Sequence, residues 1–250
     1  MNPIIRIRDL RKAFSGRPVL EGVDLDVPEG AICAVVGQSG TGKSVLFKCI
    51  MGIMKPDAGR VWYREYELTA MEHDALIDLR KHFGYSFQNA ALFDSMTVEE
   101  NIAFPLREAL GLKNRKQIKK QVDEMLEWIG LPEIGRYTVD ELSGGMRKRV
   151  GVARSLVMKP DVLFFDEPTT GLDPVLSETI DNLVVRVNGE LGVSCILITH
   201  DIPAAFRIAD KIAFLDGGRI VAEGSAKEVA ASDNELVRNF LRISFSELPV

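Results

Sequence analysis

Eight residues near the N-terminus combine glycines, a lysine and a hydroxyl in a fixed spacing. Segment 37–44 reads GQSGTGKS and fits the pattern G-x-x-x-x-G-K-[ST]. Its glycines allow successive backbone N–H groups to converge on phosphate oxygens at a helix N-terminus. The lysine adds a point charge for the β- and γ-phosphates, and the hydroxyl is a hard ligand for Mg²⁺. The predicted nucleotide-binding positions here are Gly37, Gln38, Ser39, Gly40, Thr41, Gly42, Lys43, Ser44 and Val45.

The sequence around this segment predicts a strand before it and a helix after it. Residues 31–36 are an unbroken apolar run, and residues 45–53 carry apolar side chains at helical spacing. Strand, loop and helix are the context that a phosphate-binding loop requires. Such a loop alone leaves kinases, GTPases and recombinases open.

A second buried strand is predicted to end in two carboxylates. Residues 162–165 are apolar and are followed by Asp166 and Glu167. The carboxyl end of a strand in a parallel sheet lies beside the ligand crevice. Asp166 is therefore a candidate for Mg²⁺ through water, and Glu167 is the candidate general base for the attacking water. Taken alone, two adjacent acids can also simply end a strand at the surface.

A third apolar strand, residues 195–199, ends at His200. A histidine there can donate a hydrogen bond to a γ-phosphate, although a polar residue at a strand end needs no such role. The predicted catalytic residues are Lys43, Glu167 and His200.

Four further segments, together with the first, resemble the nucleotide-binding subunit of ABC transporters. They read ELSGGMRKRVGVARSL over 141–156, VLFFDEP over 162–168, GLDP over 171–174 and ILITHD over 196–201. The resemblance covers essentially the whole chain. It implies an ATPase of the translocase class with an α/β P-loop NTPase (RecA-like) core, an N-terminal antiparallel β subdomain and an inserted α-helical signature subdomain, together the ABC ATPase fold.

The same resemblance implies partners and further site residues. Two copies would form a head-to-tail homodimer around two ATP and their Mg²⁺, beneath integral-membrane permease subunits. Each ATP would lie between the P-loop of one copy and the signature of the other. The matching residues are the lever glutamine Gln88, the signature donors Ser143, Gly144 and Gly145, and the dimer-contact residue Asp173. The implied metal ligands are Ser44, Gln88 and Asp166.

Two positions leave alternatives open. Phe14 stands where the family places an aromatic ring on adenine, but a phenylalanine in an amphipathic strand equally suits a core. Met146 stands where glutamine is usual, which puts a ribose contact from that position in doubt. The signature hydroxyl and glycine N–H groups are unaffected by this change.

The methionine and segment 87–108, FQNAALFDSMTVEENIAFPLRE, resemble the ATPase of Mla or MCE-type lipid transporters. That resemblance implies phospholipid or a related lipid as cargo, with an MCE-domain lipid-binding subunit and a small STAS-like regulatory subunit as further partners. ATPases of importers for small polar solutes, such as amino acids, share most of the outline and are the alternative. A soluble ABC ATPase acting on nucleic acid or ribosomes is a third class. Such proteins usually carry tandem units or a long coiled coil.

Composition agrees with a peripheral subunit. A net charge of -5 over 250 residues argues against a general nucleic-acid binder. No apolar stretch approaches the roughly 20 residues needed to cross a bilayer, so we expect attachment through partners at the cytoplasmic face of the inner membrane. The three cysteines lie in apolar runs, which favours buried, reduced thiols.

The pattern along the chain predicts a nucleotide-binding core over 1–88 and 158–224, an inserted helical subdomain over 89–157 and a helical tail over 225–250. Apolar positions in the tail indicate a packed face. The resemblance to lipid-transporter ATPases implies contact across the dimer or with a regulatory subunit, and packing on its own domain is the alternative. A cationic cluster in the insertion is either a solvated face or lies near anionic headgroups: Lys113, Arg115, Lys116, Lys119 and Lys120.

Overall fold

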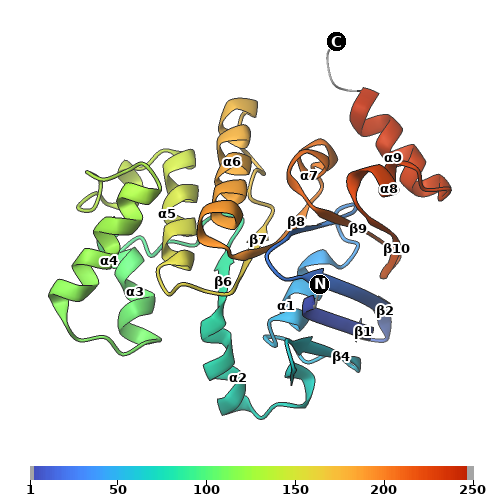
Figure 1. Cartoon of the computed structure of the whole chain (residues 1–250), viewed down its shortest axis with the longest axis horizontal. Coiled ribbons are helices and arrows are strands. Elements are labelled where there is room, and N and C mark those ends of the chain that lie inside the picture. The colour runs from blue at the N-terminus through green and yellow to red at the C-terminus, as the bar shows by residue number, and fades with distance from the viewer. Residues whose placement is uncertain (1–2, 247–250) are drawn as a thin grey trace. The chain divides into compact units, whose positions relative to one another are not determined.

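The computed structural model describes residues 3–246, and the chain divides into two compact units (Figure 1). The first unit contains Met1–Asp78 and Ser194–Val250, and the second contains Leu79–Val193. No helix among residues 3–246 is long and apolar enough to cross a membrane.

The first unit begins with an antiparallel sheet of strand order β2-β1-β4-β5. Its strands are β1 (Pro3–Phe14), β2 (Arg17–Pro28), β4 (Ala58–Tyr63) and β5 (Tyr66–Glu67). β1 and β2 form a hairpin in which Ser15 and Gly16 both have positive φ, 50° and 76°. Two such residues give the primed turn whose twist matches paired strands. The sheet is the antiparallel part predicted for the N-terminal region.

A second sheet of this unit places the phosphate-binding loop. Strands β10 (Arg219–Gly224), β9 (Lys211–Asp216), β3 (Ile32–Val36) and β8 (Ser194–Thr199) lie side by side in this order. β3 is parallel to β8 and β9, and β9 is antiparallel to β10. Every residue of β3 and β8 is buried, as expected for parallel strands covered on both faces. Both strands were predicted from their apolar runs.

The helices of the first unit follow the strands. They are α1 (Lys43–Ile50), α2 (His73–Leu79), which reaches the boundary between units, α7 (Ile202–Ile208), α8 (Ala226–Ala230) and α9 (Glu235–Ser246), with a short 3₁₀ turn η1 (Leu68–Ala70). Two of the three cysteines lie in the strands of this unit, and all three are buried and free. Burial raises the pKa of Cys33 to about 12 and that of Cys49 to about 11, so these thiols are inert packing groups.

The C-terminal helix α9 packs on its own unit. The Phe240 ring lies 5.3 Å from Phe214 in β9, and the Phe245 ring lies 5.5 Å from Phe206 in α7. Val237 is fully buried. The apolar stripe predicted for the tail therefore contacts the domain itself, which was the alternative interpretation. The last part of the predicted tail, 247–250, lies outside the described residues.

The second unit joins two parallel strands to a group of helices. β6 (Phe83–Ser86) pairs with β7 (Val162–Asp166). The helices are α3 (Val98–Glu108), α4 (Arg115–Trp128), α5 (Gly144–Leu156) and α6 (Pro174–Leu191), with 3₁₀ turns η2 (Arg80–His82) and η3 (Val139–Glu141).

The helices α3, α4 and α5 lie side by side (Figure 1), and their apolar side chains share one core. Its buried members include Val98, Ile102, Leu106, Ile118, Val122, Leu126, Val150 and Ala153. These three helices lie within 89–157, and the division into domains stays a prediction.

Candidate functional site

The phosphate-binding loop connects β3 to α1, and its glycines are required by its geometry. Gly42 is the N-cap of α1 with φ at 101°, a conformation that residues with a Cβ rarely adopt. A Cβ added at Gly37 would overlap the carbonyl oxygen of Leu215. The close approach of the β9 backbone therefore excludes any side chain at the start of the loop. The N-terminal N–H groups of α1 are left facing the loop, where they can bind an anion.

Lys43 lies on the inner side of this loop. Its side chain is buried, and Nζ donates hydrogen bonds to the carbonyl oxygens of Gly37 at 2.7 Å and Gln38 at 2.9 Å. These bonds fix a positive charge within the curve of the loop. Thr41 Oγ1 also donates to the Gln38 carbonyl, at 2.9 Å. Ser44 is exposed at the start of α1, so its hydroxyl is accessible to a ligand.

His200 lies at the same edge of the sheet as this loop. Val36 at the end of β3 pairs with Thr199 at the end of β8, so Gly37 and His200 follow directly after paired residues. His200 is exposed. The backbone beyond it is held because Asp201 N–H donates to Thr199 Oγ1 at 2.9 Å and the Asp201 carboxylate caps α7. The structure thus brings the loop and the histidine to the same edge of the sheet.

Phe14 is the last residue of β1 and is 44% exposed. The Lys12 ammonium lies 5.6 Å from the centre of its ring, within cation–π range. The core interpretation of Phe14 is therefore wrong, because too much of the ring is in solvent. Its role toward adenine stays a prediction.

In the second unit, Asp166 ends β7 and is bound by a residue that the sequence did not reveal. The Tyr85 hydroxyl donates a hydrogen bond to Asp166 Oδ2 at 2.5 Å. Burial raises the pKa of Tyr85 well above its usual value, and the hydrogen bond and charge of Asp166 act in the same direction. Tyr85 is therefore a permanent donor that orients this carboxylate. In the parallel register Tyr85 pairs with Phe164, two residues before Asp166, so only the strand pairing could have found it.

Glu167 has a strained backbone next to this pair. Its φ is 48°, a conformation that costs energy in residues other than glycine and recurs at functional sites. The Thr170 hydroxyl donates to Glu167 Oε2 at 3.1 Å. Together the backbone and this hydrogen bond fix where the carboxylate lies.

Lys148 is a second residue that sequence reasoning missed. It is 9% exposed, and its Nζ donates to the Pro168 carbonyl at 2.8 Å. Burial lowers its pKa, whereas the charges of Glu167 and Asp166 raise it. Lys148 thus places a buried positive charge beside both carboxylates. Its position in α5, five residues after Ser143, carries no motif that would single it out.

The signature residues begin α5. Ser143 is the N-cap, and its Oγ accepts the Met146 N–H at 3.3 Å. Ser143 and Gly144 are exposed, so the first N–H groups of a 13-residue helix face outward. Gly145 is buried, and a Cβ there would lie 3.0 Å from Leu176. Met146 packs against the core of the helices, so its side chain serves packing.

Gln88 is exposed just after β6, and the loop that follows it is anchored by the signature helix. Arg154 donates from Nη1 to the Ala91 carbonyl and from Nη2 to the Ala90 carbonyl, both at 2.7 Å. Ala90 and Ala91 have positive φ, 59° and 47°. Arg154 is buried, which lowers its pKa. The sequence did not reveal this link between α5 and the loop.

Asp173 caps α6 and is exposed. Its Oδ1 accepts the N–H groups of Val175 and Leu176, each at 3.0 Å. Asp173 shares the second unit with Asp166, Glu167 and the signature, whereas the P-loop and His200 belong to the first. The site roles of all these residues stay predictions.

Comparisons with a family model, with related proteins and with solved structures all identify the same family. The family model described as ABC transporter matches residues 20–170. The methionine import ATP-binding protein MetN of Brucella abortus (strain 2308) is 38% identical over 248 residues, which are 99% of this chain and 67% of that protein. MetN 2 of Rhodococcus jostii (strain RHA1) is 40% identical over 233 residues, 92% of this chain and 68% of that protein. These relatives are named for methionine import, so they do not support the lipid-transporter resemblance.

Solved structures agree. The structure of cbiO1 from Clostridium perfringens, described as part of the ABC transporter complex cbiONQ, has a TM-score of 0.85 at 32% identity and covers 98% of this chain and 99% of that one. The bacterial ABC transporter cassette MJ0796, described as dimeric, has a TM-score of 0.80 at 29% identity, with 89% and 98% covered. The predicted fold and the predicted enzyme class are both confirmed. This chain belongs to the ABC transporter family, as an ATP-hydrolysing subunit with the ABC ATPase fold.

Proposed function

We propose that this chain is the ATPase subunit of an importer for a small polar solute such as an amino acid. The observation that carries the import class is the 38% identity to a methionine import ATP-binding protein over 99% of the chain. Two copies would act on integral-membrane permease subunits at the cytoplasmic face of the membrane. This interpretation replaces lipid transport as the main one.

The loop of the first unit would hold the triphosphate of ATP. Its N–H groups and the fixed Lys43 ammonium supply donors and charge for phosphate oxygens. The exposed Phe14 ring would stack on adenine, and His200 would donate to the γ-phosphate. A hydroxyl and a carboxylate are the oxygen ligands that Mg²⁺ prefers, so Ser44 and Asp166, with Gln88, would each be a candidate ligand for that ion.

Bound Mg²⁺ neutralises charge on the β- and γ-phosphates. The Tyr85 hydroxyl donates to Asp166 Oδ2. This hydrogen bond would hold the carboxylate in one orientation toward Mg²⁺. Glu167 would accept a proton from the water that attacks the γ-phosphorus. The new bond joins the water oxygen to phosphorus, the bond to the β-phosphate oxygen breaks, and ADP and phosphate leave.

A second copy of the chain would complete each site. Ser143 and Gly144 are exposed at the N-terminus of α5. Their hydrogen-bond donors would therefore be available to a nucleotide bound by the other copy. Asp173, exposed at the N-terminus of α6, would contact the other copy. The dimeric description of the MJ0796 cassette supports this arrangement.

The permease would dock beside Gln88. A hollow of about 480 Å³ opens among β6, α3 and α5 of the second unit. Its lining is mostly apolar and includes Tyr85, Phe87, Phe93, Phe104, Pro105 and Met158. An apolar groove of this kind accepts an amphipathic helix.

One observation favours phospholipid as a second candidate cargo. The segment 87–108 that resembles lipid-transporter ATPases supplies much of the lining of that hollow, including Phe87, Phe93 and Phe104. We expect the sequence of a surface that binds the permease to depend on the type of permease. An MCE-domain subunit and a STAS-like subunit would then be partners.

Purification of the native membrane complex separates the two candidates. The importer predicts permease subunits without an MCE-domain protein, and ATPase activity that rises with an amino acid and its binding protein. A complex that contains an MCE-domain subunit and bound phospholipid, with no response to amino acids, would overturn the import class. The ATPase itself is tested by the substitutions discussed below.

A further inference from the structure

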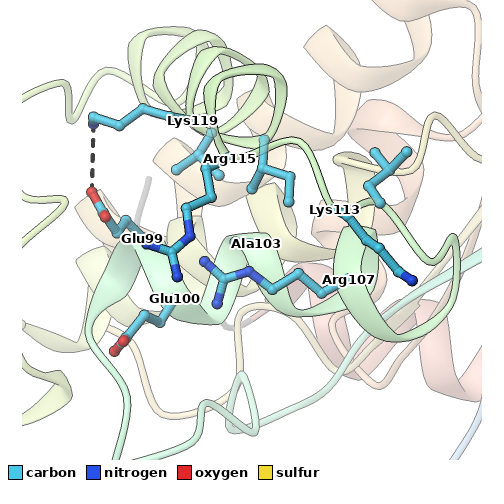
Figure 2. Close-up of a pocket in the computed structure, with 10 residues that line it drawn as sticks. Glu99, Glu100, Ala103, Arg107, Lys113, Arg115 and Lys119 are labelled. Carbon is cyan, nitrogen blue, oxygen red and sulfur yellow. Dashed lines mark hydrogen bonds and ion pairs between the residues drawn. The ribbon is translucent and has the colours of Figure 1, made fainter.

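The second unit contains a larger hollow that nucleotide hydrolysis does not use. It has a volume of about 740 Å³ and lies between α3 and α4 (Figure 2). Its floor is apolar and its rim carries charge. The floor is formed by Ala103, Leu112, Ile118 and Val122, three of which are buried in the core of the helices.

Three cations from different elements reach the rim. Arg107 lies at the end of α3, Lys113 in the connecting loop, and Arg115 at the start of α4. Figure 2 shows the guanidinium groups of Arg107 and Arg115 pointing toward each other. Within residues 3–246, none of the three cations forms a hydrogen bond or an ion pair with a carboxylate. The two facing guanidinium charges repel each other unless an anion lies between them.

The two carboxylates at the rim are already engaged. Glu100 accepts the Thr97 N–H at 2.9 Å and the Thr97 hydroxyl at 3.0 Å, and these bonds lower its pKa, with a smaller effect from Arg107. Glu99 lies 3.5 Å from Lys119, which also binds Asp123 at 2.9 Å. With Lys119 the lining carries four cations against these two carboxylates, so the rim keeps an excess of positive charge.

The local charge contrasts with that of the whole chain. Residues 107–120 include six cations and one carboxylate, whereas the chain has a net charge of -5. The N-terminus of α4 opens at the same rim, and its dipole favours an anion there. A net acidic protein that gathers cations around a hollow provides a local field for a negative ligand.

We propose that this hollow binds a phosphate-bearing anion. Planar guanidinium groups bind phosphate oxygens in pairs, so Arg107 and Arg115 would bind the phosphate from two sides. The Lys113 ammonium points away from this pair in Figure 2 and would add only a more distant positive charge. An apolar part of the ligand would lie over Ala103, Leu112, Ile118 and Val122. The phosphate comes either from a soluble organic phosphate or from the headgroup of an anionic lipid. The site is independent of the proposed importer function.

The test uses the full chain with its P-loop saturated by ADP and Mg²⁺, so that added phosphate compounds do not bind there. Glycerol 3-phosphate is titrated by calorimetry, and vesicles of phosphatidylglycerol in phosphatidylcholine are used for co-sedimentation. The site variant is Arg107→Gln/Arg115→Gln. The matched control, Lys116→Gln/Lys120→Gln, removes the same charge from the other side of α4, where Lys120 lies 3.7 Å from Glu124.

We expect the site variant to bind about thirtyfold more weakly, because each of the two cations near an anionic group contributes about a factor of five. The control should stay within about threefold of the native chain. Both variants should keep the native melting temperature and basal ATPase activity. Binding of glycerol 3-phosphate without vesicles identifies a soluble ligand, and binding of vesicles alone identifies a headgroup. Equal losses in the two double variants, or no binding of either probe, would overturn the proposal.

Discussion

Glu167 combines a strained backbone, a hydrogen bond from Thr170 and a nearby buried lysine, Lys148. A residue that merely ended a strand would need none of these. The strain must be offset by the rest of the fold, and its persistence indicates that the position of the carboxylate matters. The chemistry of this residue is directly testable.

Glu167→Gln keeps the size of the side chain but removes its ability to accept a proton. We expect ATP turnover to fall by at least about a hundredfold, within the range of general base catalysis, while ATP binding is retained. Steady-state ATPase rates and equilibrium nucleotide binding measure both. Lys43→Ala is the contrasting control, because losing the charge inside the P-loop should abolish binding itself. Native turnover in Glu167→Gln would exclude this residue from proton transfer.

Tyr85→Phe removes only the hydroxyl that binds Asp166. Loss of a group that orients a metal ligand costs about ten- to a hundredfold in metal affinity or activity. We expect the Mg²⁺ concentration for half-maximal ATPase activity to rise by about tenfold. Phe87→Leu, on the exposed neighbour whose ring lies 4.3 Å from that of Tyr85, controls for lost packing. An unchanged Mg²⁺ dependence in Tyr85→Phe would show that Asp166 needs no such support.

These residues also show what the sequence could reveal. Gly37, Lys43 and Asp166 were predicted because each belongs to a contiguous motif or ends an apolar run. Tyr85 and Lys148 were missed because they reach the carboxylates through strand register and helix packing, which leave no local spacing in the sequence. Contacts of this kind need the fold first.

Among the elements, α5 does more than present the signature. Arg154 near its C-terminal end binds both carbonyls of the left-handed alanines after Gln88. One rigid helix therefore joins the signature residues at its start to the loop that lines the proposed permease groove. A displacement of one end of α5 would therefore be transmitted to the other end.

Arg154→Met should destabilise the protein by about 2–4 kcal/mol, because it leaves the carbonyls of Ala90 and Ala91 without their buried charged donor. Arg154→Lys should recover only part of this, since an ammonium cannot make the same paired contact. Urea unfolding followed by circular dichroism measures the change. Arg147→Met, which loses a single bond to the Leu142 carbonyl at 3.2 Å, is the milder control. Equal stability of both methionine variants would contradict the anchoring role.

The tail helix offers a second test at this scale. Phe240→Ala removes an aromatic contact with the fully buried Phe214, which we expect to lower the free energy of unfolding by about 1–3 kcal/mol. Arg242→Ala, on an exposed position of the same helix, should change it by less than about 0.5 kcal/mol. Thermal unfolding monitors both. If Phe240→Ala melted normally but the dimer dissociated, the tail would serve assembly as first expected.

Elements were predictable where burial dictates a simple pattern. β3, β7 and β8 are continuous apolar runs because both faces are covered. β1 showed only partial alternation, and the structure gives the reason. Its pairing with β2 shifts register after Ile7, near Asp9 with φ at 46°, and each shift moves later side chains to the other face.

At the scale of the whole molecule, the nucleotide-binding motifs account for the ATPase, whereas we expect the cargo to depend on surfaces that contact partner proteins. The P-loop, the two carboxylates and the signature carry the resemblance to ABC ATPases, and the comparisons with known proteins confirm the ATPase class. The hollow next to Gln88 and the cationic hollow between α3 and α4 consist of residues outside those motifs. The specific biology of this chain therefore has to be tested on the assembled pair and its partners.

The proposed nucleotide site would be shared between two chains. Ser143 caps its own helix and is exposed, so its donors are available to a nucleotide held by another copy. Ser143→Arg should therefore abolish activity and ATP-driven pairing while the nucleotide affinity of the single chain stays nearly native. In a mixed dimer of Lys43→Ala with Ser143→Arg, both defects fall in one site if the signature acts on the partner, and the other site stays intact. We expect one trapped ATP per mixed dimer, counted after stabilising the complex with Glu167→Gln in both chains. A count of zero would show that each signature serves its own P-loop, because then both sites would carry a defect.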